Sequence, residues 1–127
     1  GGASRAQLVG KRIGLTSVVQ FNDGKATLSA SSEPLLDDIA EVMRGNPQLL
    51  KVLVGGHTDG RGDEAMNQRL SEDRARAVVD ALVARGIDRG RLASRGYGSK
   101  KPIVPNATRV GQEKNRRVEF IVLEQSR

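Results

Sequence analysis

The alternation of strand-like and helix-like segments most constrains what these 127 residues can fold into. Helical spacing of apolar residues occurs at 32–45 and from about 63 to 85, and strand-like runs occur at 18–21, 51–54, 92–97 and 117–123. This βαβαββ order predicts an α+β fold, a two-layer α/β sandwich with both main helices on one face of a mixed sheet. Residues 1–15 are expected to be a lead-in without a strong pattern, and residues 16–127 to form one domain.

Local start and stop signals delimit the two helices. Ser32 is expected to cap the first helix by accepting amide hydrogen bonds, and Pro34 is tolerated in the first turn. Gly45 is expected to end that helix, and Gly86 the second one, because glycine readily adopts the conformation of a helix C-terminus. The segment around Pro105 is expected to be a polar loop.

The charge of the chain excludes little by itself. A net charge of +6 raises nucleic acid as a partner, but the 15 acidic residues are interleaved with the 21 basic ones. The aromatic residues are Phe21, Tyr97 and Phe120, which leaves few platforms for stacking bases. We therefore expect a solvated basic surface and no nucleic-acid partner, with a basic nucleic-acid-binding module as an alternative. No apolar run approaches the ~20 residues of a membrane span, and no signal peptide is evident.

A charged residue interrupts the apolar stripe of the second helix. On a helical wheel at ~100° per residue this stripe is formed by Leu70, Ala77, Val78 and Ala81. Arg74 falls at its centre and Asn67 beside it. Arginine keeps its proton, and burying its charge unpaired costs several kcal/mol. The pattern therefore predicts an anionic partner for Arg74, supplied either by the fold or by a ligand.

A carboxylate lies at the start of the connection into the same helix. Asp59 follows a short buried strand and a glycine pair, at the end of a strand where βα units often bind ligands. A fixed carboxylate and a fixed guanidinium can form an internal salt bridge. They can equally receive a zwitterion, whose ammonium meets Asp59 and whose carboxylate meets Arg74 in a two-point fork. A helix-capping or turn aspartate is the structural alternative.

Catalytic and metal-binding patterns are weak in this sequence. His57 is the only histidine and cysteine is absent, so the His57-x-Asp59 spacing lacks further ligands and no metal site is expected. Thr58 and Ser71 are hydroxyls near His57, but no nucleophile motif accompanies them, and no cofactor is expected. Arg116 precedes a second arginine at the start of the last strand, so one of the two can approach the site.

Four motifs together resemble a known family. They are Gly56-His57-Thr58-Asp59, Asn67-x-x-Leu70-Ser71-x-x-Arg74-Ala75, Gly96-Tyr97-Gly98 and Asn115-Arg116-Arg117-Val118-Glu119. In this order and spacing they are similar to the OmpA-like C-terminal domain family, which includes peptidoglycan-associated lipoproteins and the periplasmic part of flagellar stator proteins. The resemblance spans about residues 18–123.

This resemblance implies a domain that binds peptidoglycan without cutting it. In such domains the residues matching Asp59 and Arg74 hold the two ends of the diaminopimelate side chain in the stem peptide. The residues matching Asn67 and Arg116 usually assist. Thr58 belongs to the first motif and is a further candidate ligand-binding residue.

Two places depart from the family pattern. Gln112 and Glu113 stand where the segment before Asn115 usually has Arg-Ala. Asn22 stands directly after Phe21, where family members commonly have an aspartate, and the aspartate comes one place later at Asp23. We keep Asn22 as a candidate ligand-binding residue.

The resemblance also implies a place in the cell. We expect a cell-wall anchor in the periplasm, attached to the outer or inner membrane through an N-terminal region missing from this chain. Envelope proteins are possible partners at the exposed loop around Lys100 and Lys101. A peptidoglycan-processing enzyme is the remaining alternative.

Overall fold

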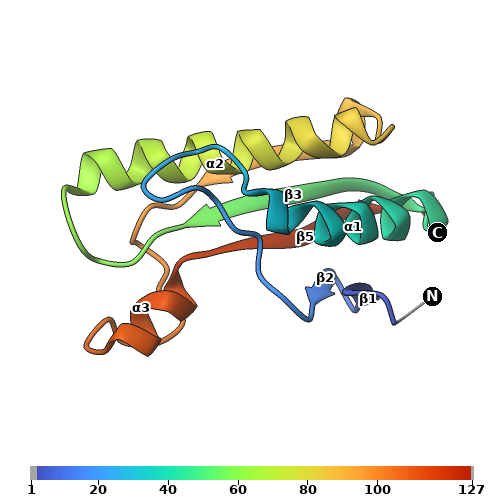
Figure 1. Cartoon of the computed structure of the whole chain (residues 1–127). Coiled ribbons are helices and arrows are strands. Elements are labelled where there is room, and N and C mark those ends of the chain that lie inside the picture. Colours follow the sequence, from blue (N-terminus) through green and yellow to red (C-terminus); the bar gives the residue numbers. More distant parts are fainter. Residues whose placement is uncertain (1–2, 127) are drawn as a thin grey trace.

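A five-stranded mixed sheet with two long helices on one face forms the domain (Figure 1). The computed structural model describes residues 3–126. Its strands are β1 Ala6–Val9, β2 Arg12–Leu15, β3 Leu49–His57, β4 Leu92–Gly96 and β5 Arg117–Gln125. Its α-helices are α1 Glu33–Gly45, α2 Glu64–Ala84 and α3 Arg109–Asn115, and short 3₁₀ turns lie at Ala30–Ser32 and Arg89–Arg91. No helix in this range is long and apolar enough to span a membrane.

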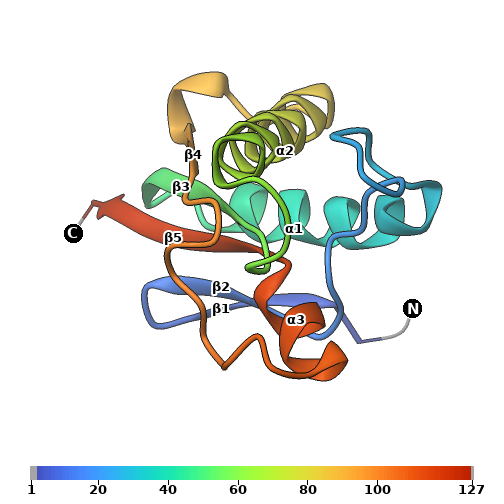
Figure 2. The ribbon, with the colours of Figure 1, turned by 90° about the vertical axis from the view of Figure 1, so that its left-hand side faces the viewer.

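The strand order in the sheet is β1-β2-β5-β3-β4. Strands β3 and β4 are parallel because α2 crosses between them, and the other neighbouring pairs are antiparallel. Viewed along the sheet, α1 and α2 lie on the same side of it (Figure 2). The expected α+β sandwich with a mixed sheet and both main helices on one face is confirmed.

The first strand was predicted at the wrong place. Residues 18–20 form no strand, and Phe21 makes only an isolated bridge with Leu28. The sheet begins instead within the expected lead-in, where β1 and β2 form a hairpin that pairs Val9 with Arg12 across a two-residue turn. Ala6 in this hairpin is only 3% exposed and belongs to the core. Four-residue strands carry too little alternation to be recognised, although the Gly-Lys turn between them is a hairpin signal.

The element order after β4 also differs from the prediction. The expected polar loop contains α3, so the last two strands are separated by a helix rather than adjacent as in βαβαββ. Thr108 caps α3, since its Oγ1 accepts a hydrogen bond from the Gly111 amide at 3.0 Å. Seven residues are too few to show helical periodicity, so α3 gave no clear pattern.

The ends of the long helices follow local signals with one exception. Asp63 caps α2 by accepting from the Met66 amide at 3.1 Å, and Gly86 has the left-handed φ of 92° expected beyond a helix end. The predicted side-chain cap by Ser32 is wrong. Its Oγ instead bonds both backbone groups of Gln20, at 2.6 and 3.0 Å, and so ties the segment before α1 to the helix start.

Helix α2 packs closely on the sheet because two glycines face it. Gly56 of β3 and Gly96 of β4 are direct neighbours in register. A Cβ at Gly56 would collide with the backbone carbonyl of Ser71, and one at Gly96 with the backbone amide of Glu72. These positions let α2 approach the strands that lead into the site.

We expect Gly56→Ala to lower the free energy of unfolding by about 1–3 kcal/mol, because the added methyl forces helix and strand apart. Chemical denaturation monitored by circular dichroism measures this. Gly45→Ala is the matched control, since its Cβ would meet nothing within 4 Å, and it should leave stability unchanged or slightly raised. Equal stability of the two variants would contradict the close packing.

Candidate functional site

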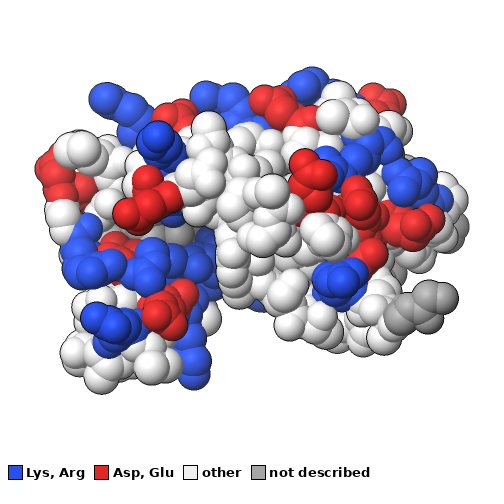
Figure 3. All heavy atoms as spheres, in the orientation of Figure 1, with Lys and Arg blue, Asp and Glu red and all other residues white. Residues whose placement is uncertain are grey.

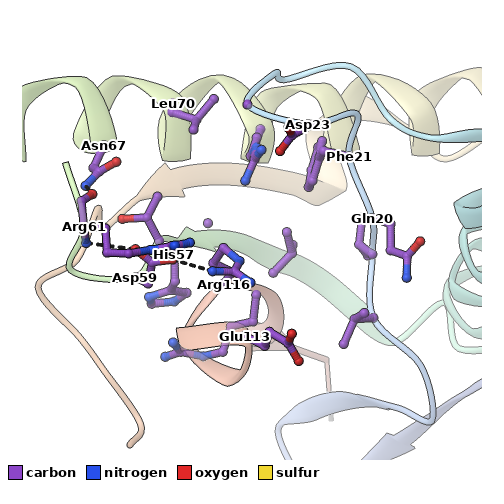
Figure 4. Close-up of a pocket in the computed structure, with 18 of the residues that line it drawn as sticks. Gln20, Phe21, Asp23, His57, Asp59, Arg61, Asn67, Leu70, Glu113 and Arg116 are labelled. Atoms are coloured by element: carbon purple, nitrogen blue, oxygen red, sulfur yellow. Dashed lines mark hydrogen bonds and ion pairs between the residues drawn. The ribbon is translucent and has the colours of Figure 1, made fainter. Parts of the chain in front are cut away.

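A cavity of about 740 Å³ lies between the segment before α1, the end of β3, α2 and the α3–β5 junction (Figure 4). Five of the six predicted site residues line it: Thr58, Asp59, Asn67, Arg74 and Arg116. Residues that the sequence did not single out as ligands also line it, among them Phe21, Asp23, Arg61 and Glu113. The motifs therefore meet in one hollow although they are far apart in the chain.

Asp59 is the buried carboxylate of this cavity, with only 5% of the residue exposed. Its oxygens accept hydrogen bonds from the Arg61 amide at 2.8 Å, from the Arg61 guanidinium at 3.1–3.3 Å, and from Arg116 Nη1 at 2.5 Å. Burial alone would raise the pKa of Asp59. The hydrogen bonds from Arg61 and Arg116 outweigh burial and lower that pKa. Asp59 is therefore ionised at neutral pH.

The turn after Asp59 brings Arg61 back to it. Gly62 has a φ of 85°, which allows the chain to fold over, and the bond from the Arg61 amide to Asp59 closes an Asx turn. Asn67 at the start of α2 donates to the Arg61 carbonyl oxygen at 2.7 Å and fixes this turn to the helix. Asn67 thus lies at the cavity, where its side-chain amide supports the loop.

Arg116 reaches Asp59 from the end of α3. The preceding Asn115 is fully buried, and its side chain bonds the amide of Ile103 and the carbonyl of Val104, both at 2.8 Å. This network holds the loop before α3. The next arginine, Arg117, bonds Glu119 at 2.9 Å and also lines the cavity, so the consecutive arginines have different carboxylate partners. The expected strand alternation does not apply to this pair, because β5 begins only at Arg117 and both arginines reach the site.

Arg74 lies at the border of the buried face of α2, not at its centre as predicted. The buried residues of this helix are Ser71, Ala75, Val78, Val79 and Leu82. On the same wheel the middle of that face is about 80° away from Arg74. The reason is the close contact of Gly56 and Gly96 with Ser71 and the backbone of Glu72, which turns that side of α2 toward β3 and β4.

Arg74 is half-buried and has no carboxylate within 4.0 Å among residues 3–126. Its Nε donates to the Lys25 carbonyl oxygen at 2.8 Å, and its guanidinium carbon lies 4.8 Å from the centre of the Phe21 ring. Burial, and then the nearby charge of Arg116, lower the pKa of Arg74, whereas the charge of Asp23 raises it. The guanidinium is held in place but lacks a counter-ion.

The internal Asp59–Arg74 bridge considered from the sequence is not formed. Asp59 is paired with Arg61 and Arg116 instead, and Figure 4 shows it between these two arginines. Neither motif analysis nor helix periodicity identified Arg61 as a partner. The only signal was its position two residues after Asp59 between two glycines, which is typical of a tight turn.

Asn22 and Thr58 differ in their relation to the cavity. Asn22 does not line it, because its side chain is tied across the local turn by a 2.9 Å bond from Nδ2 to Thr27 Oγ1. The neighbouring Asp23 lines the cavity instead. Thr58 is buried there, and its Oγ1 has no hydrogen-bond partner within the described part of the chain.

His57 lines the cavity at the end of β3 and is almost fully buried. Its ring stacks on Tyr97 with centroids 5.0 Å apart, and Nε2 lies 3.6 Å from a Glu119 oxygen. Burial, followed by the positive charge of Arg117, lowers the pKa of His57 to about 4, against the opposing effect of Glu119. Residues 3–126 hold no cluster of three or more His, Cys, Asp or Glu side chains suited to a metal ion.

We expect the single histidine to titrate near pH 4 in NMR spectra of the folded protein. The unfolded chain takes up this proton near pH 6.5. It therefore binds more protons than the folded state between pH 6.5 and 4, and His57 makes the fold less stable as the pH falls through that range. An imidazole midpoint at or above 6.5 would contradict a desolvated ring.

Comparison with known proteins agrees with the motifs. The peptidoglycan-binding protein ArfA of Mycobacterium tuberculosis is 43% identical over 101 residues, which cover 80% of this chain and 30% of ArfA. This chain therefore spans less than a third of that relative's length. Among solved structures, the cell wall anchor of the T6SS from Pseudomonas aeruginosa is 35% identical with a TM-score of 0.73, covering 83% of this chain and 75% of that one.

A second solved structure has the same fold. The peptidoglycan-associated lipoprotein from Burkholderia pseudomallei has a TM-score of 0.73 and 27% identity, covering 81% of this chain and 86% of that one. The model of the OmpA family matches residues 20–116, a range that contains all six predicted site residues. By this match over most of its length, the chain belongs to the OmpA family.

Proposed function

We propose that this domain binds peptidoglycan through the diaminopimelate residue of the stem peptide and anchors an envelope protein to the cell wall. The observation that carries the proposal is Arg74, a guanidinium that is held at a cavity and has no carboxylate partner among residues 3–126. The names of two relatives support peptidoglycan as the ligand, since ArfA is a peptidoglycan-binding protein and the T6SS structure is a cell wall anchor.

Arg74 is suited to the carboxylate of the ligand. Within the described part of the chain only its Nε is engaged, by the Lys25 carbonyl, so the two terminal nitrogens have capacity for a two-point bond to a carboxylate. The Phe21 ring packs against the guanidinium and restricts its motion. The partial burial of Arg74 strengthens its attraction to an anion relative to that of a fully solvated arginine.

Asp59 is suited to the ammonium of the same residue. It is ionised, lines the same cavity and stays linked to Arg116. Thr58 lines the cavity beside Asp59 and stays a candidate contact at this end, although its Oγ1 is itself buried. Asn67 contributes by holding the Asp59 loop against α2.

The hydroxyl and imidazole groups of the site are not arranged as a nucleophile and its base, which supports binding without cleavage. Ser71 Oγ is buried and already bonded to the Gln68 carbonyl and the Gly98 amide, at 2.8 and 2.9 Å. His57 faces Glu119 and not a nucleophile. A peptidoglycan-processing enzyme would need an activated nucleophile or a free pair of acids, and Asp59 is bound by two arginines.

The charge distribution favours this role over nucleic-acid binding. Figure 3 shows basic and acidic side chains intermixed over the face of the molecule that it presents, without a continuous basic stripe. We propose a periplasmic location, with attachment to a membrane through a region of the parent protein outside this chain. Partner proteins of the envelope are part of the same proposal.

One such site is expected to bind weakly, with an affinity between micromolar and millimolar, or ~4–8 kcal/mol. Many tethered copies facing a polymer that repeats its epitope would still hold the wall firmly. Weak single contacts are compatible with an anchor that lets the polymer be remodelled.

Arg74→Gln should weaken binding to diaminopimelate-type peptidoglycan about 10- to 150-fold, because a charge-assisted bond contributes ~1.5–3 kcal/mol. Arg74→Lys keeps the charge but loses the two-point geometry, so its affinity should lie between those of Arg74→Gln and the wild type. Co-sedimentation with purified peptidoglycan over a range of concentrations measures both.

Asp59→Asn should weaken the same binding to a similar extent by removing the charge that attracts the ammonium. Arg69→Gln is the matched control, because this exposed arginine of α2 does not line the cavity. It should pellet like the wild type. Undiminished pelleting of folded Arg74→Gln and Asp59→Asn proteins, with the fold checked by circular dichroism, would refute the proposed function.

A further inference from the structure

The carboxylate of Asp59 has no vacant acceptor position in this structure. Two carboxylate oxygens offer about four such positions. The Arg61 amide and Nε occupy Oδ1 at 2.8 and 3.3 Å. Arg61 Nη2 at 3.1 Å and Arg116 Nη1 at 2.5 Å occupy Oδ2. A ligand ammonium can reach Asp59 only if one of these donors leaves.

Arg61 and Arg116 are not equally free to leave. The Arg116 side chain is 35% exposed and follows directly on the fully buried Asn115. The Arg61 side chain is 63% exposed and stands between Gly60 and Gly62 in a surface turn. Within residues 3–126, Asp59 is the only carboxylate within 4.0 Å of Arg61. The guanidinium of Arg61 is therefore the donor that water can most easily take over.

We propose that Arg61 is a specificity-determining residue, whose guanidinium occupies the place of the ligand ammonium until the ligand displaces it. This inference rests on the proposed function and concerns its cationic half. In the empty site, Arg61 satisfies the acceptor positions of the buried Asp59. This is favourable because a buried carboxylate without hydrogen-bond donors is destabilising. On binding, one cation replaces another and the charge balance around Asp59 is preserved.

The two halves of the site then respond differently to a ligand. A carboxylate can reach Arg74 without any displacement, because the terminal nitrogens of Arg74 are not engaged. An ammonium must compete with Arg61, so Arg61 reduces the affinity for zwitterionic ligands and leaves that for simple carboxylates unaffected. Water competes for the guanidinium of Arg61, whose side chain is 63% exposed, and this weakens its ion pair with the buried Asp59. We therefore expect the competition to correspond to a factor of about two to five in affinity.

Two peptides test the proposal by isothermal titration calorimetry. One is the stem tripeptide that ends in meso-diaminopimelate, and the other is the same tripeptide acetylated on the free amine of that residue. We expect Arg61→Gln to bind the free-amine tripeptide two- to fivefold more tightly than the wild type does. The acetylated tripeptide should bind both proteins equally.

Arg61→Ala is the second variant, because the glutamine amide could itself donate to Asp59 and mask the gain. Arg69→Gln removes the same charge from an exposed position outside the cavity, and should leave the ratio of the two affinities at its wild-type value. Its behaviour separates local competition from the general loss of one positive charge.

The outcomes separate this inference from the function on which it rests. Binding by the wild type with an unchanged or lowered affinity ratio in both Arg61 variants overturns the role of Arg61 alone. An equal gain for both peptides also overturns it, because the effect would then not depend on the ammonium. Absence of binding of either peptide to wild type and variants overturns the proposed function, and this inference with it.

Discussion

The ion pair between Asp59 and Arg116 is the interaction on which the geometry of the site depends. Asp59 follows β3 and Arg116 precedes β5, and these two strands are antiparallel neighbours with His57 opposite Arg117. The pair therefore closes the end of a strand ladder and fixes the two loops that leave it. Because Asp59 is almost fully buried, the bond also removes the unfavourable burial of a lone carboxylate. The cavity opens where this ladder ends and α2 begins.

The charge balance around this ion pair favours a ligand that brings a carboxylate. Asp59 is bonded to two guanidinium groups, and a third, that of Arg74, borders the same cavity. Asp23 and Glu113 also line it, but neither lies within 4.0 Å of Arg74. Burial, and then repulsion from Arg116, disfavour the charge of Arg74 and lower its pKa. An incoming anion relieves this repulsion at the same place where it gains hydrogen bonds.

The long elements were predictable because several independent signals agree in them. Helix α1 combines apolar spacing with Pro34 and Gly45, and β3 and β5 each contain a short apolar run, at 52–54 and 120–123. The β1–β2 hairpin and α3 were not predicted, because each of these elements has only four to seven residues. At that length one or two polar residues remove the periodicity, and stability comes from contacts with distant segments.

The residues that line the cavity were predicted more completely than the ion pairs between them. Ordered motifs placed Asp59 and Arg74 at one cavity although periodicity put Arg74 in the centre of the buried stripe. A helical wheel predicts the buried face of a helix from its apolar residues. In this interface, the buried face of α2 is determined instead by how closely Ser71 can approach Gly56. The pairing of Asp59 with Arg61 depends on the φ of Gly62, which composition and spacing do not specify.

The position of Arg74 at the border of the buried face connects folding with function. At the centre of that face its charge would require an internal carboxylate, and the resulting bridge would leave nothing for a ligand. On the fully exposed side, water would screen the charge and the Phe21 ring could not hold it. The close contact between α2 and the sheet sets the rotation of the helix, and this rotation leaves the guanidinium half-buried at the cavity wall. The contact of Gly56 and Gly96 with α2 thereby determines how strongly the site can attract an anion.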